Sequence, residues 1–294
     1  MHVLDAAAES GVTFFDTADV YGDGRSEQII GEWLAAHPDA GVTVGTKMGR
    51  RVPQLEENYT LANFRKWLDR SRRNLRQDSL DLVQLHCPPT PVYSNEQVFD
   101  ALDQLVEENV ISNYGVSVET TQEALTALAR PGLASVQIIF NPFRLKPLEE
   151  VFPAAAQAAG VGIIVRVPLA SGLLSGKYNR STRFPEHDHR SYNRNGSAFD
   201  VGETFSGVNF EQGLEAVAEF QELVPEGLTT AQAALAWITS QTGVTTVIPG
   251  ARNAAQAKAN TAAAQGVGQL SPAFDGGVRR IYDKYFREAV HPRW

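Results

Sequence analysis

The sequence predicts an α/β fold, a (β/α)8 barrel of the TIM type, formed by a single domain over residues 1–294. Short apolar runs rich in β-branched residues alternate with longer amphipathic segments, as in chains built from strand–helix units. The apolar runs are nearly continuous, which is typical of parallel strands that are buried on both faces. The length of 294 residues fits one large barrel.

The elements follow one another in a regular order. The first is a helical pattern at residues 4–10, before any strand. Strands are predicted at residues 12–15, 42–46, 80–85, 113–117, 135–140, 162–167 and 244–248. Further helical patterns cover residues 27–36, 61–75, 95–108, 121–129, 148–159, 210–223, 230–239, 253–264 and 278–289. This alternation predicts right-handed crossovers and a parallel sheet.

The strand count leaves two interpretations open, because a (β/α)8 barrel needs an eighth strand. Either the chain begins after the first barrel strand, or the sheet is open. In the first case, the strands at 12–15 and 244–248 would face each other across a gap with unpaired backbone groups. We would then expect lower stability or self-association. Residues 171–207 form no regular pattern, and a loop of this length is usually functional.

Composition argues against several classes of protein. The net charge of −8 and pI near 5.3 disfavour nucleic acid as a partner. Cys87 is the single cysteine, so no intramolecular disulfide can form, which fits the cytoplasm. We expect no membrane span or signal peptide, because the sequence has no apolar run of ~20 residues and no basic leader. We also expect no metal site, since residues 187–189 offer only an isolated His-Asp-His in a polar loop.

Four reactive side chains follow three consecutive predicted strands. Asp16 and Tyr21 follow the first strand, Lys47 the second and His86 the third. Because the carboxyl ends of barrel strands meet at one mouth, we expect these side chains to lie together. Each has a structural explanation alone, as a cap, a solvated cation, a core aromatic or a structural imidazole, but their joint placement favours catalysis.

Carbonyl reduction is the chemistry that needs this set. Hydride reaches the carbon while the oxygen takes a proton, and tyrosine, with a pKa of about 10, holds a proton at neutral pH. A lysine nearby would stabilise the phenolate. A carboxylate would keep that lysine charged and oriented. A histidine could hydrogen-bond the carbonyl oxygen.

Segments along nearly the whole chain resemble the aldo-keto reductase family. They are FFDTADVYG at 14–22, GTK at 45–47, LH at 85–86, VPLASGLLSGKY at 167–178 and VIPGARN at 247–253. The resemblance implies a (β/α)8 barrel whose N-terminal hairpin and first strand are absent from this chain. It also implies a catalytic tetrad of Asp16, Tyr21, Lys47 and His86.

The resemblance further implies an NADPH site across the mouth of the barrel, with the nicotinamide near Ser117 and Gln137. Val118 stands where the family commonly has asparagine. A helix start after residue 250 offers free N–H groups for phosphate, and Arg252 suits a 2′-phosphate. No Rossmann fingerprint occurs in the sequence. The predicted cofactor-binding residues are Ser117, Gln137, Arg166, Pro168, Leu169, Ser171, Leu173, Ser175, Lys177, Gly250, Arg252, Gln256 and Asn260.

The sequence suggests three classes of function. The first is an NADPH-dependent oxidoreductase that acts on small aldehydes, ketones or sugars. The second is a cofactor-binding regulatory barrel with little or no turnover, because some aldo-keto reductase relatives are channel-associated subunits. The third, a metal-dependent barrel hydrolase or lyase, lacks ligands. The intact tetrad favours the first, while the substrate, the physiological direction and the oligomeric state stay open.

Overall fold

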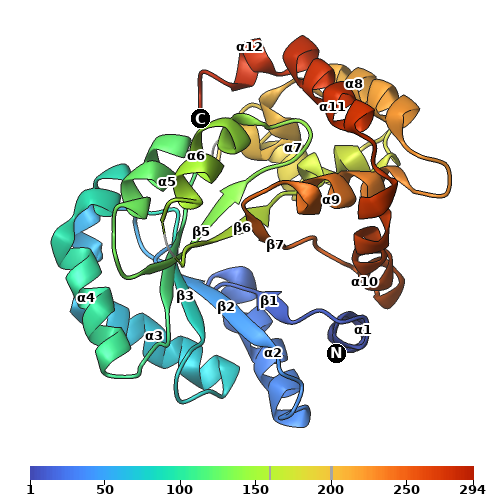
Figure 1. Ribbon diagram of the computed structural model, residues 1–294. Coiled ribbons are helices and arrows are strands. Elements are labelled where there is room, and N and C mark those ends of the chain that lie inside the picture. Colours follow the sequence, from blue (N-terminus) through green and yellow to red (C-terminus); the bar gives the residue numbers. More distant parts are fainter. Residues whose placement is uncertain (159, 199–200) are drawn as a thin grey trace.

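The computed structural model describes residues 1–158, 160–198 and 201–294. Its core is a curled parallel sheet of seven strands that follow the chain order from β1 to β7. Helices surround the outside of this sheet (Figure 1). The strands are β1 (Phe14–Asp16), β2 (Thr43–Met48), β3 (Leu82–His86), β4 (Tyr114–Ser117), β5 (Leu133–Ile139), β6 (Gly162–Arg166) and β7 (Val244–Val247).

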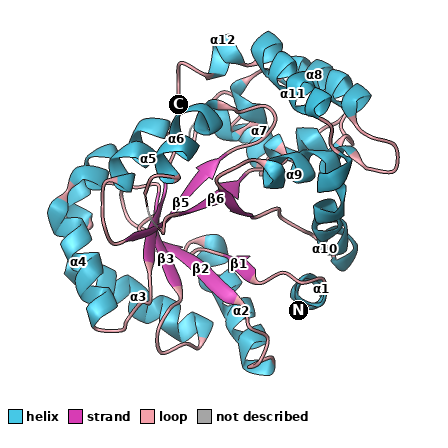
Figure 2. Ribbon diagram, viewed as in Figure 1, coloured by secondary structure: helices cyan, strands magenta, loops and turns pink. Residues whose placement is uncertain are grey.

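Most of the helices cover the outer face of the sheet, as Figure 2 shows with helices in cyan. Several begin at a side-chain cap, and Thr120 and Thr229 each form a full capping box with the residue three positions later. The helices are α1 (His2–Glu9), α2 (Arg25–Ala36), α3 (Leu61–Leu75), α4 (Glu96–Glu107), α5 (Thr121–Leu128), α6 (Lys146–Ala155), α7 (His189–Tyr192), α8 (Phe210–Leu223), α9 (Thr230–Ser240), α10 (Ala254–Thr261), α11 (Pro272–Tyr285) and α12 (Arg287–Val290).

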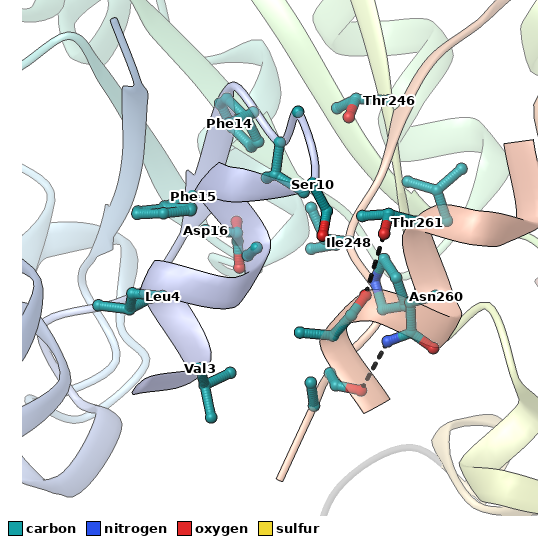
Figure 3. A pocket seen from close by; sticks show the side chains of 18 of the residues that line it. Val3, Leu4, Ser10, Phe14, Phe15, Asp16, Thr246, Ile248, Asn260 and Thr261 are labelled. Carbon is teal, nitrogen blue, oxygen red and sulfur yellow. Dashed lines mark hydrogen bonds between the residues drawn. The ribbon is translucent and has the colours of Figure 1, made fainter. Parts of the chain in front are cut away.

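The two ends of the sheet differ from its middle. Within the described residues, β1 pairs only with β2, and β7 pairs only with β6. Helices α1 and α10 pack against each other outside the interval between β1 and β7. A cavity of about 830 Å³ lies between them and the two strands, and Leu4, Phe14 and Ile248 are among the residues that line it (Figure 3). The strand order and alternation fit a (β/α)8 barrel, while the absence of a first strand stays a prediction.

The irregular segment at 171–207 contains short helical turns and its own packed aromatic cluster. Phe184 lies 5.2 Å from Tyr178 and 5.7 Å from Phe205, measured between ring centroids. Asp188 caps α7 and pairs with Arg190, so one member of the His-Asp-His sequence has a structural role. Residues 199 and 200 of this segment lie outside the described residues, as does Ala159, the predicted end of the sixth barrel helix.

Some predicted boundaries were wrong. The last helical pattern was predicted at 278–289, but α11 begins at Pro272 and ends at Tyr285, before the short α12. The early start has a local cause, because proline is favoured in the first turn of a helix. No helix in the described part of the chain is long and apolar enough to cross a membrane.

Candidate active site

Backbone hydrogen bonds fix the loop after β1, residues 17–24, against β2. The amide of Thr17 donates to the carbonyl oxygen of Gly45 at 2.8 Å, and the amide of Asp19 donates to that of Lys47 at 3.0 Å. The amide of Tyr21 then closes a turn on Ala18 at 3.1 Å. The loop therefore carries Tyr21 to the carboxyl end of the strand that carries Lys47.

Lys47 is buried and ion-paired. Its side chain is 1% exposed, and Nζ lies 2.6 Å from Oδ2 of Asp16 and 2.8 Å from the carbonyl oxygen of Thr17. The side-chain amide of Gln137, in β5, donates to Oδ1 of Asp16 at 2.8 Å. Burial lowers the pKa of Lys47, while attraction to Asp16 acts against this. Asp16 and Lys47 thus form a fixed pair at the floor of the mouth.

Tyr21 and His86 meet edge to face beside this pair. Their ring centroids are 5.8 Å apart at 86°, and Lys47 Nζ lies 5.3 Å from the centroid of the Tyr21 ring. The four residues predicted from successive strand ends therefore lie together. Burial raises the pKa of Tyr21, and the charge of Asp16 raises it further, whereas Arg166 lowers it. Because 42% of Tyr21 is exposed, water in the open mouth offsets part of this rise.

His86 lies in a cationic environment. Burial lowers its pKa well below 6.5, and the charges of Lys47, Arg50 and Arg166 lower it further. The imidazole is therefore neutral at neutral pH. Its Nδ1 atom is buried and has no hydrogen-bond partner among the residues that the structure describes.

Two ion pairs that the sequence did not indicate line the same mouth. Arg50 pairs with Glu119 at 2.9 Å and donates to the carbonyl oxygen of His86 at 3.2 Å. Arg166 pairs with Glu203 at 3.1 Å and donates to the carbonyl oxygen of Val118 at 3.0 Å. Arg166 was predicted only as a cofactor contact, yet here it is the cation that lowers the pKa of Tyr21.

The candidate residues for the nicotinamide and pyrophosphate fall into two groups. Ser117, the last residue of β4, and Gln137, within β5, are both buried beside the tetrad, where Ser117 is the register partner of His86 and Gln137 bonds Asp16. Ser171 instead joins two loops, because its hydroxyl donates to the carbonyl oxygen of Glu203 at 2.7 Å. Leu173 is 1% exposed and belongs to the hydrophobic core. Pro168 is also buried, Leu169 and Ser175 are half-buried, and Lys177 is exposed.

Side chains of α10 form hydrogen bonds with the backbone of the loop between β7 and α10. Gln256 accepts from the amide of Arg252 at 2.8 Å, and Asn260 donates to the carbonyl oxygen of Gly250 at 3.2 Å. Figure 3 shows the Asn260 contact beside the cavity. Asn253 caps α10 by accepting from the amide of Gln256 at 2.9 Å. Gln256 and Asn260 therefore hold the loop that presents Arg252.

A family model described as the aldo/keto reductase family matches residues 1–273 of the chain. The protein belongs to the aldo/keto reductase family.

Known members of the family resemble the chain over most of its length. Aldo-keto reductase yakc of Schizosaccharomyces pombe, whose name specifies NADP(+), is 29% identical over 85% of this chain and 73% of its own. A probable voltage-gated potassium channel subunit beta of Oryza sativa is 31% identical over 92% of this chain and 83% of its own. The solved glycerol dehydrogenase AKR11B4 of Gluconobacter oxydans is 29% identical, with a TM-score of 0.77 over 100% of this chain and 88% of that one.

The residues of this aldo/keto reductase fit a nicotinamide nucleotide with a phosphate at its adenosine end. A Cβ added to Gly250 would meet no atom within 4 Å, so open space adjoins the loop before α10. Arg252 is exposed, and the structure records no ion pair for it within its described part. At the other end, Ser117 places a hydroxyl beside His86 and Cys87.

Proposed function

We propose that this protein is an NADPH-dependent oxidoreductase that reduces an aldehyde or ketone carbonyl to an alcohol, with Tyr21 as the general acid. The observation that carries the proposal is the buried Lys47–Asp16 pair within reach of the Tyr21 and His86 rings. Membership of the family supports an oxidoreductase, and the name of the Schizosaccharomyces pombe relative supports NADP as its cofactor.

The tetrad residues would have different roles at the carbonyl oxygen. NADPH supplies a hydride to the carbonyl carbon when bound. The carbonyl oxygen would lie between the Tyr21 hydroxyl and the His86 imidazole, which meet edge to face. The lowered pKa of His86 keeps the imidazole neutral, so it orients the oxygen by a hydrogen bond. The Tyr21 hydroxyl gives its proton to the oxygen as negative charge develops there.

The charged residues around Tyr21 would stabilise the phenolate that this step leaves. The raised pKa of Tyr21 keeps its hydroxyl protonated until negative charge develops on the substrate oxygen. Arg166 attracts the phenolate, and Lys47, whose Nζ lies 5.3 Å from the centroid of the Tyr21 ring, adds a second positive charge. Asp16 holds Lys47 in place, and Gln137 holds Asp16.

We further propose that Arg252 selects NADPH over NADH. A guanidinium at an exposed helix start suits a 2′-phosphate, which NADH lacks. Its backbone is fixed by Gln256, so the loop is ordered before the cofactor arrives.

Tyr21→Phe tests the proposed acid directly. The ring is kept and only the hydroxyl is lost, so folding and NADPH affinity should survive. We expect kcat for an activated aldehyde to fall about 10²- to 10⁴-fold, followed by absorbance of the reduced nicotinamide. Tyr285→Phe is the control, because it removes a hydroxyl that bonds Glu219 between α11 and α8.

An unchanged kcat in Tyr21→Phe, with intact cofactor binding, would contradict the mechanism. It would favour the cofactor-binding regulatory barrel instead. Loss of both cofactor binding and folding in Tyr285→Phe would show that hydroxyl removal acts through stability.

A further inference from the structure

We propose that Arg166 biases this site toward the reduced cofactor, because its charge opposes the positively charged ring of NADP+ but not the neutral ring of NADPH. The inference rests on the proposed function, since it concerns the nicotinamide that would deliver hydride to the carbonyl. Arg166 would thereby favour reduction over oxidation at equilibrium on the protein.

The guanidinium of Arg166 extends from β6 across the mouth of the barrel. Its Nη2 donates to the carbonyl oxygen of Val118, which follows β4, and lies 3.9 Å from Sγ of Cys87, which follows β3. Its Nη1 pairs with Glu203 from the irregular segment. Only 12% of the side chain is exposed, so water screens its charge weakly.

The hydride donor must lie in the same mouth. Hydride transfer needs the donor carbon about 3 to 3.5 Å from the carbonyl carbon. The carbonyl oxygen is expected at Tyr21 and His86, so the donor ring lies within a few ångström of them. The field of Arg166 already reaches both residues, because it lowers the pKa of His86 and opposes the rise in that of Tyr21.

The other cations of the mouth are closely paired. Lys47 lies 2.6 Å from Asp16, and Arg50 lies 2.9 Å from Glu119. Arg166 is also paired, with Glu203 at 3.1 Å, but its charge affects the pKa of Tyr21 more strongly than the opposite charge of Glu203 does. Its positive charge can therefore be left unbalanced, or removed, by single substitutions on either side of the pair.

The test is the ratio of two dissociation constants, that for NADP+ over that for NADPH. Both cofactors carry the same phosphates, so the ratio isolates the charge of the ring. Glu203→Gln leaves Arg166 unbalanced and should raise the ratio, whereas Arg166→Met leaves Glu203 unbalanced and should lower it. We expect changes on the order of tenfold, as one charge a few ångström away produces in partly solvated protein. Quenching of tryptophan fluorescence reports binding of both cofactors.

Glu149→Gln is the matched control, because Glu149 pairs with Arg287 at 2.7 Å on the outside of the barrel. It should leave the ratio unchanged. Opposite shifts of the ratio in Glu203→Gln and Arg166→Met support the proposal. Loosening of the irregular segment would instead shift the ratio in the same direction in both variants. An unchanged ratio in Glu203→Gln, or shifts of the same sign, overturns it, even if Arg166→Met does not fold. Failure of the unmutated protein to bind either cofactor would instead refute the proposed function.

Discussion

Replacing Asp19 with asparagine is expected to stabilise the protein at pH 8 and to have little effect near pH 4. Asp19 lies in the loop that carries Tyr21, is 2% exposed, and its Oδ1 has no hydrogen-bond partner among the described residues. Its pKa is raised from 3.8 to about 7. Burial is the largest cause and the charge of Glu27 adds to it, while Arg51, Arg70 and the backbone of Val20 act in the opposite direction.

The magnitude follows from the proton that this carboxyl holds. An unfolded aspartate has a pKa of about 3.9, so between pH 4 and 7 the folded protein keeps a proton that the unfolded chain releases. The stability that Asp19 contributes is therefore fully present below pH 4 and is lost as the pH rises through about 7. A shift of about three units, at 1.36 kcal/mol each, sets an upper bound of ~4 kcal/mol. Asparagine cannot ionise and avoids this loss.

Urea unfolding of both proteins from pH 4.5 to 8 measures the effect. The difference in unfolding free energy should grow by about 1.4 kcal/mol per pH unit and level off above pH 7. Subtracting the two curves cancels the groups that they share. Asp39→Asn is the control, because Asp39 is exposed, and its difference should stay near zero. A flat difference for Asp19→Asn, or a destabilised variant at pH 8, would refute a protonated Asp19.

Three further substitutions test the proposed site. Lys47→Met should lower kcat about as much as Tyr21→Phe, by 10²- to 10⁴-fold, and normal steady-state turnover would contradict the assigned role. Asp16→Asn leaves Lys47 buried without its charge partner, so urea unfolding should show a loss of about 3 kcal/mol, and undiminished stability would argue against that pairing. Arg252→Ala should weaken NADPH by ~2 to 3 kcal/mol and leave NADH unaffected in titrations, whereas equal affinity of the unmutated protein for both would exclude the selection.

The strands were predictable because their burial leaves a strong pattern. For example, β6 is a run of apolar residues closed by Arg166, and the prediction at 162–167 differs from it by one residue. The bounds of the last helices were less predictable, because they depend on packing against other helices. A Cβ on Gly277 of α11 would lie 2.5 Å from Cδ1 of Leu223 in α8, so close helix contact explains a glycine that helix propensity disfavours.

The order of the predicted strands also indicated that the four tetrad residues lie together. It could not indicate Glu119 or Glu203, because their partners lie 69 and 37 residues away and only the fold makes them neighbours. Glu203 has no periodic pattern around it, since its segment is irregular. Ion pairs between such segments leave no signal in one sequence, although Arg50 could be suspected from its place three residues after Lys47.

Different groups position Tyr21 and determine the charge around it. The backbone amide of Asp19, rather than its side chain, ties the loop to Lys47, so the loop can stay in place when the carboxyl is replaced. The buried acid is then a source of instability next to a functional residue, a combination common at active sites. Its effect should reach Tyr21 only through the local field. A proton donor that is positioned by backbone contacts can keep its place while the charges around it set how readily its proton leaves.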